Sequence, residues 1–241
     1  MGYSLRLPMK LGNQIAALSK PARMFYGLAM IVFGVQHLVY GQYVTRVFPK
    51  LPLPAQLAGI VLMIAGGLIL LGRWVRTAAL ALAFLILTTF LLFYVPQLLK
   101  APFLGGVWTN AGKALALAGG ALLVAGLFRT VGRALLSAFL ILGGIQHFLY
   151  PGFVAALVPH WMPWHLFWTY LAAVALIAGG IGLHVRSTRE LAGLLTGTMI
   201  FLWVFLLHIP RALAAPRNTN ETTAVFEALA FSGIAWLAAR R

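Results

Sequence analysis

Apolar stretches long enough to cross a membrane recur along the whole chain and limit what it can fold into. A hydrocarbon core about 30 Å thick is crossed by roughly 20 residues of helix. Counting the apolar runs that are bounded by charged residues, glycine or proline predicts eight spans, and hence an all-α integral membrane protein with eight transmembrane helices. The predicted spans are Met24–Tyr40, Pro54–Leu71, Thr77–Val95, Ala111–Phe128, Ala134–Tyr150, His165–Leu183, Leu191–Ile209 and Thr223–Ala239.

Composition supports a membrane protein over a soluble one. Of the 241 residues, 62% are hydrophobic and only 9% are charged, whereas about a quarter of a soluble domain is charged. A net charge of +15 would favour nucleic-acid binding in a soluble protein. Here the basic residues lie mostly between the apolar runs, where they meet lipid head groups. We therefore expect the lipid bilayer, and no nucleic acid, as a partner.

The basic residues also predict an orientation. Twelve of the 18 fall on one predicted side of the membrane, the side that carries both termini. The positive-inside rule places that side in the cytoplasm, so we expect a multi-pass protein of a bacterial-type inner membrane with both termini cytoplasmic. Residues 1–21 are expected to form a cytoplasmic N-terminal segment, in which about Met9 to Ser19 is a candidate for a short helix lying in the interface.

The second half of the chain repeats the pattern of the first. Three motifs recur at offsets of 110 to 114 residues: "QH" from Gln36 and Gln146, "IAGG" from Ile64 and Ile177, and "FYVPQLLKAP" from Phe93 as "LHIPRALAAP" from Leu207. We therefore expect two four-helix repeats, residues 22–129 and 130–241. Because each repeat has an even number of helices, both should share one orientation and be related by a pseudo-twofold axis along the membrane normal.

Several stretches resemble the DoxX family of four-helix membrane proteins. They are "GGIQHFLYPGFVAALVPHWMPW", "ALIAGGIGL", "FLLHIPRAL" and "WTNAGKALALAGGALLVAG". The resemblance covers nearly the whole chain after about Lys20 and implies four-helix bundles, here in duplicated form. Through the related DoxD subunit of thiosulfate:quinone oxidoreductase, it also implies an association with membrane redox chemistry. Many DoxX-like proteins carry a glutamate ahead of the second-helix glycine pair, where this chain has Met63 and Leu176.

Polar residues inside spans are candidates for function, because a charge at mid-span costs roughly 2.5–3.5 kcal/mol on insertion scales. The predicted helix directions gather six of them in one layer, roughly 5 Å below the outer surface. They form two expected patches, His37, Tyr94 and Lys113 in the first half and His147, His208 and Glu227 in the second, adjoined by Gln36, Gln146 and Arg211. Glu227 takes the place that Lys113 holds in the first half, and His208 and Arg211 are its expected partners.

These patches have two interpretations. The side chains can hydrogen-bond loop carbonyls and fasten the helices together at the outer interface. Alternatively, a patch binds the head group of a small molecule such as a quinone, with a histidine exchanging protons near neutral pH. In that case we expect the second patch to carry any ligand-linked protonation, because it combines His147 and His208 with the Glu227 carboxylate.

Other chemistries find little support in the sequence. The chain has no cysteine, so it carries no thiol relay. Haem ligation is not favoured, because His37 and His147 lie near the outer helix ends and nothing shows that their faces converge. His160 and His165 lack a metal-binding spacing, so no metal site is expected.

The chain also lacks a nucleotide-binding motif and a nucleophile constellation, which argues against an autonomous enzyme. Its catalytic residues and cofactor stay unassigned. We expect a small-molecule-binding subunit of a redox-associated complex with redox protein partners. The alternative is a non-enzymatic membrane scaffold or a small-molecule transport protein.

Overall fold

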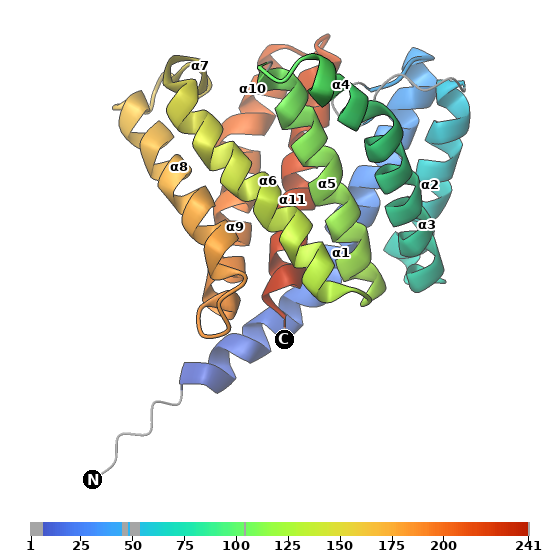
Figure 1. The fold of residues 1–241 in the computed structure, drawn as a ribbon, viewed down its shortest axis with the longest axis horizontal. Helices are drawn as coiled ribbons and strands as arrows, with labels where there is room; N and C mark the ends of the chain where they lie inside the picture. Colours follow the sequence, from blue (N-terminus) through green and yellow to red (C-terminus); the bar gives the residue numbers. More distant parts are fainter. Residues whose placement is uncertain (1–6, 45–47, 49–53, 104, 241) are drawn as a thin grey trace.

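Helices make up the fold (Figure 1). The computed structural model describes residues 7–44, 48, 54–103 and 105–240, and within these ranges it contains no strand. The longer helices are α1 (Leu7–Tyr40), α2 (Ala55–Leu71), α3 (Val75–Thr89), α5 (Gly105–Ala125), α6 (Arg129–Leu149), α8 (His165–Gly182), α9 (Arg189–Trp203) and α11 (Thr219–Ala239). The short ones are α4 (Val95–Lys100), α7 (Pro151–Ala155) and α10 (Ile209–Ala214), and the π-helical turns are η1 (Phe90–Tyr94) and η2 (Val204–His208).

Seven helical segments of the described chain are long and apolar enough to cross a membrane. Two of them combine several elements: Val75–Lys100 joins α3, η1 and α4, and Arg189–Ala214 joins α9, η2 and α10. The eighth expected span, α2, has only 17 residues. The prediction of an all-α membrane protein is thus confirmed, and the eighth span stays a prediction.

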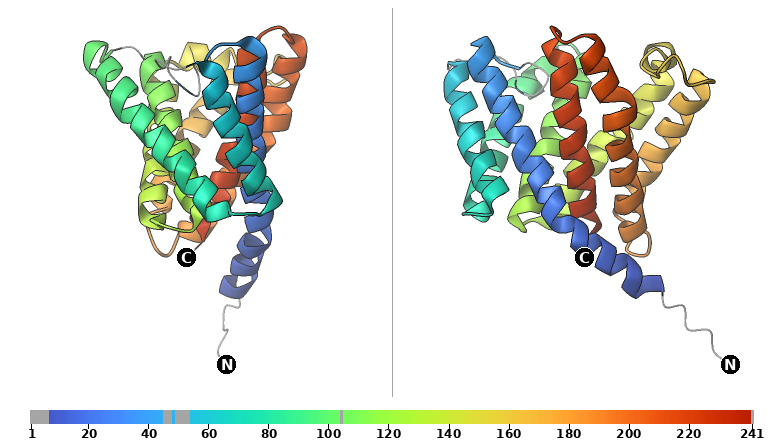
Figure 2. Two further views of the ribbon diagram at one scale, coloured as in Figure 1. Left: turned by 90° about the vertical axis from the view of Figure 1, so that its right-hand side faces the viewer. Right: turned by 180° about the vertical axis from the view of Figure 1, so that it is seen from behind.

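Helix α1 begins earlier than its predicted span. It runs without a break from Leu7 through Pro21 to Tyr40. The segment expected as a separate interfacial helix, Met9–Ser19, is therefore the first part of this helix. Figure 2 shows that this part extends beyond the ends of the other helices.

The long helices pack in a closed circuit that follows the chain. Along it, α1 contacts α2, α2 contacts α3, α3 contacts α5, α5 contacts α6, α6 contacts α8, α8 contacts α9, α9 contacts α11, and α11 returns to α1. Helices α5 and α11 also contact each other, and they are the most buried of the candidate spans. The expected layout of two parallel-repeat four-helix bundles is not confirmed, because α11 packs on α1 and α5 packs on α6.

Glycines allow the closest of these contacts. A Cβ atom added to Gly34 of α1 would lie 2.5 Å from the carbonyl oxygen of Gly59 in α2. Within a membrane, small residues let helix backbones approach so that van der Waals packing holds them together. At this point, α1 and α2 therefore pack backbone against backbone.

The start of α1 and the end of α11 lie at the same end of the molecule (Figure 1). The turn between α5 and α6 is also at that end, and it is made by Gly126 and Phe128, both with positive φ. At the opposite end, α5 and α11 begin, and Lys113 and Glu227 each follow eight residues after the start of their helix, or about 12 Å along its axis.

Candidate functional site

An ion pair joins the two halves of the chain in the interior. Lys113 Nζ of α5 lies 2.7 Å from Glu227 Oε2 of α11. The Lys113 side chain is 14% exposed and that of Glu227 is 4% exposed. The pair lies where α5 and α11 meet, so the two central helices of the circuit are linked by opposite charges.

Part of the hydrogen-bonding capacity around this pair is unused. The second carboxylate oxygen of Glu227, Oε1, is buried and has no hydrogen-bond partner in the described structure. The hydroxyl of Tyr94 is likewise buried and lacks one there. Glu227 acts electrostatically on Tyr94, so the phenol and the carboxylate belong to one polar region. The acceptor Glu227 Oε1 and the donor Tyr94 hydroxyl are therefore available for further hydrogen bonds near the ion pair.

Two glutamines connect helices across the halves at this depth. Gln36 Oε1 of α1 lies 3.0 Å from the Thr223 hydroxyl of α11. Gln146 Oε1 of α6 lies 2.9 Å from the Thr109 hydroxyl of α5, and its Nε2 donates to the Gly105 carbonyl oxygen. Each threonine is one turn before a member of the ion pair, so the hydrogen bonds and the ion pair form one layer.

The two π-helical turns present Tyr94 and His208. In each, a backbone N–H bonds five residues back: Val95 to Phe90 and Ile209 to Val204. A proline follows directly in both segments. Proline has no N–H and its ring crowds the carbonyl four residues earlier, which accounts for the wider turn. Tyr94 and the half-buried His208 are the last residues of these turns.

The histidines at 37 and 147 lie at the margin of this layer. His37 Nδ1 is 2.6 Å from the Phe33 carbonyl oxygen, and His147 Nδ1 is 2.7 Å from that of Gly143. Since a carbonyl oxygen only accepts, Nδ1 carries the proton in both rings and Nε2 is left as an acceptor when the ring is neutral. His37 is fully buried against Tyr43 and Phe48, and its Nε2 has no hydrogen-bond partner in the described residues.

The expected role of Arg211 is wrong. Arg211 Nη2 lies 2.8 Å from Glu221 Oε1, so its ion pair is with Glu221 and the ion pair of Glu227 is with Lys113. The predicted separation into two patches is also wrong for Lys113 and Glu227, because each belongs to a different predicted patch. The ion pair places both in a single region shared by the two halves.

Sequence reasoning missed Thr109, Thr223 and Glu221. The two threonines carried a usable signal, because they are 114 residues apart, the same spacing as Lys113 and Glu227. Nothing comparable marks Glu221, whose pairing depends on the fold of α10 against α11.

A metal site is not supported in the described chain, where no group of three or more potential metal ligands comes together. The rings of His160 and His165 lie 6.4 Å apart without a third ligand of that kind. The polar layer instead offers an ammonium, a carboxylate, a phenol and two amides, which suit hydrogen bonding and proton exchange.

Fold and polar layer together define a multi-span α-helical membrane protein with a buried ionisable pair. Residues 19–95 match the DoxX family. This confirms the resemblance to that family for this part of the chain, whereas the stretches that carry the resemblance, residues 108–126 and within 143–213, lie outside the match. Residues 136–236 match a domain of unknown function (DUF8561). No curated protein and no solved structure matches the chain.

Proposed function

We propose that the polar layer around Lys113 and Glu227 binds the head group of a small amphipathic molecule such as a quinone. The observation that supports this is the group of buried polar atoms that lack a hydrogen-bond partner within the described residues. They are Gln36 Nε2, His37 Nε2, Tyr94 Oη and Glu227 Oε1. Each such atom costs about 1–3 kcal/mol of folding free energy. A bound polar group that satisfies them would offset this cost.

The available atoms suit a quinone head group in both of its redox forms. A quinone carbonyl accepts hydrogen bonds, and the Tyr94 hydroxyl and the Gln36 amide can donate them. A hydroquinone hydroxyl donates, and Glu227 Oε1 can accept. Lys113 Nζ contacts Oε2 of Glu227 and leaves Oε1 available. In this proposal the electrons come from redox protein partners, because the chain contains no cysteine pair of its own.

We further infer that the chain is a tandem duplication with eight spans, comprising residues 22–129 and 130–241. Three features support the repeat at an offset of 110 to 114 residues: the π-helical turns, the Gln–Thr hydrogen bonds and the Lys113/Glu227 positions. In this arrangement α2 is the eighth span, and the Lys113–Glu227 pair lies on the pseudo-twofold axis. The distribution of the basic residues supports an orientation with both termini in the cytoplasm, in a bacterial-type inner membrane.

Mass spectrometry of the protein after gentle purification tests the binding proposal. We expect a quinone or a related amphiphile to be retained at about one molecule per chain. The Glu227→Gln variant should lose most of it, whereas Glu190→Gln should keep it. Glu190 serves as a matched control because it lies at the far end of the bundle, at the start of α9. A wild-type protein without any such molecule would contradict the proposal and favour a non-enzymatic scaffold.

A further inference from the structure

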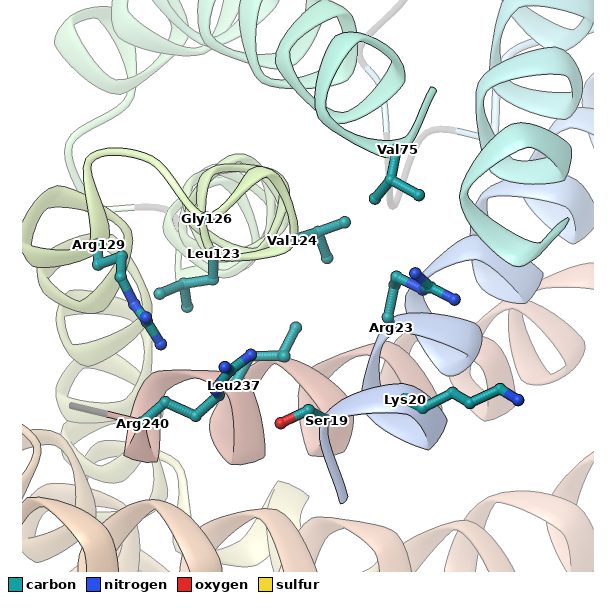
Figure 3. A pocket seen from close by; sticks show the side chains of 10 residues that line it. All are labelled: Ser19, Lys20, Arg23, Val75, Leu123, Val124, Gly126, Arg129, Leu237 and Arg240. Carbon is teal, nitrogen blue, oxygen red and sulfur yellow. The ribbon is translucent and has the colours of Figure 1, made fainter. Parts of the chain in front are cut away.

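A hollow of about 400 Å³ lies at the end of the bundle opposite the polar layer (Figure 3). It is bounded by α1, the start of α3, the α5–α6 turn and the end of α11. Four of its ten lining residues are basic and none is acidic. The basic residues are Lys20, Arg23, Arg129 and Arg240.

Arg129 and Arg240 form no ion pair within the described residues. In Figure 3, their side chains extend toward each other below Leu123, whereas those of Arg23 and Lys20 extend away from them. Arg240 acts on Arg129 as a like charge, and Arg129 acts in the same way on the neighbouring Arg133. Such repulsion between neighbouring guanidinium groups is relieved when an anion lies between them.

Two arginine N–H groups beside the hollow are unused hydrogen-bond donors within the described residues. The Nε atoms of Arg23 and Arg129 are buried and have no hydrogen-bond partner in the described residues. The remaining guanidinium nitrogens offer forked N–H groups that match the oxygens of a phosphate. Glu190, the acid of α9, lines an adjoining smaller hollow together with Arg240 and does not line this one.

The lining also has an aliphatic part, which lies among the basic residues. It is formed by Val75 of α3, Leu123 and Val124 of α5, and Leu237 of α11. A ligand held here therefore meets both cationic and aliphatic side chains. Basic pockets between transmembrane helices bind the head groups of anionic lipids through this combination.

We propose that this hollow binds a phosphate group through Arg129 and Arg240. The phosphate is carried by an anionic phospholipid or is free in solution, and the aliphatic part of the lining favours the lipid. This site is separate from the polar layer: Lys113 and Leu123 are ten residues apart on α5, or about 15 Å. Its test therefore succeeds or fails independently of quinone binding.

Thermal unfolding of the purified full-length protein in detergent tests the proposal. Three probes are added in turn: inorganic phosphate, short-chain phosphatidylglycerol and short-chain phosphatidylcholine. We expect phosphatidylglycerol to raise the unfolding midpoint with a saturable dependence on its concentration, because a ligand of the native state stabilises it. Phosphatidylcholine should not do so. The Arg129→Gln/Arg240→Gln variant should bind phosphatidylglycerol about tenfold more weakly or worse, since two charge-assisted contacts are lost.

The matched control is Arg73→Gln/Arg76→Gln, which removes two exposed charges near the same end of the bundle without touching the lining. It should bind as the wild type does. If the double variant does not fold, Arg240→Gln alone serves, because Arg240 is exposed next to the end of α11. Saturation by inorganic phosphate, with no further gain from the lipid, identifies the free ion as the ligand. Equal responses to both lipids, or equal losses in lining and control variants, would overturn the proposal.

Discussion

Lys113 of α5 and Glu227 of α11 form an ion pair 2.7 Å long in the interior of the protein. They are 114 residues apart, the offset that also relates Thr109 to Thr223 and Tyr94 to His208. If the halves are a tandem duplication, these positions were once identical. One now carries a cation and the other an anion, which makes the two halves complementary.

Breaking this pair should destabilise the protein more than removing it. Lys113→Met or Glu227→Gln alone leaves an uncompensated charge in a buried position, which costs about 3–5 kcal/mol. The double variant Lys113→Met/Glu227→Gln should regain much of that stability. Unfolding in detergent, measured for all four members of the cycle, checks this. Additive losses from the two single changes would show that the pair has no coupling energy.

The glutamine hydrogen bonds should differ in strength. Gln36 and Thr223 are both buried, whereas Gln146 is half-buried. Removing the first bond with Thr223→Val should cost about 0.5–1.5 kcal/mol of unfolding free energy. Thr109→Val, the matched change in the other half, should cost less because water can reach Gln146. The same unfolding assay compares the two, and a larger loss from Thr109→Val would contradict the assignment.

Neighbouring glycines on α6 offer a packing test. A Cβ atom at Gly144 would lie 2.5 Å from Ile177 Cγ1 and 2.7 Å from the Ala173 carbonyl oxygen of α8. Gly144→Ala should therefore destabilise the protein by about 1–3 kcal/mol. At Gly143 the nearest atom would be 3.8 Å away, so Gly143→Ala should be neutral or stabilising. Unchanged melting of Gly144→Ala would mean that α6 and α8 are farther apart than described.

Reporter fusions test the proposed orientation. Fusions after Arg129 and after the C-terminal residue should both report the cytoplasm, because each follows an even number of proposed spans. A fusion in the turn after α2, at Arg73, should also report the cytoplasm if α2 crosses the membrane. An external signal at Arg73 would show that α2 does not span.

The class of the protein and most of its helices could be predicted from the sequence. The span expected at His165–Leu183 coincides with α8, and that at Thr223–Ala239 coincides with most of α11. Apolar length and flanking charge are local properties, so a linear reading recovers them. The span expected to end at Val95 continues to Lys100, because the π-helical turn accommodates Pro96 without ending the helix.

The partners within the polar layer could not be predicted in the same way. The sequence gives the position of a residue along its helix. It correctly predicted that Lys113 and Glu227 lie at the same depth as each other. Which helix faces another depends on the closed circuit of packing, in which α5 meets α11 from the opposite half. Arg211 was therefore assigned to the wrong carboxylate, since Glu221 and Glu227 lie on the same helix less than two turns apart.

Titration with a short-chain quinone tests the central claim most directly, that the shared polar layer is a binding site. Binding is measured in detergent from the shift of the unfolding midpoint, for the wild type and for Lys113→Met/Glu227→Gln. The double variant is uncharged at both positions and should stay folded. We expect saturable binding to the wild type and binding at least about tenfold weaker to the variant, because the charged acceptor is lost. Equal binding to both proteins, or none to the wild type, would contradict the account.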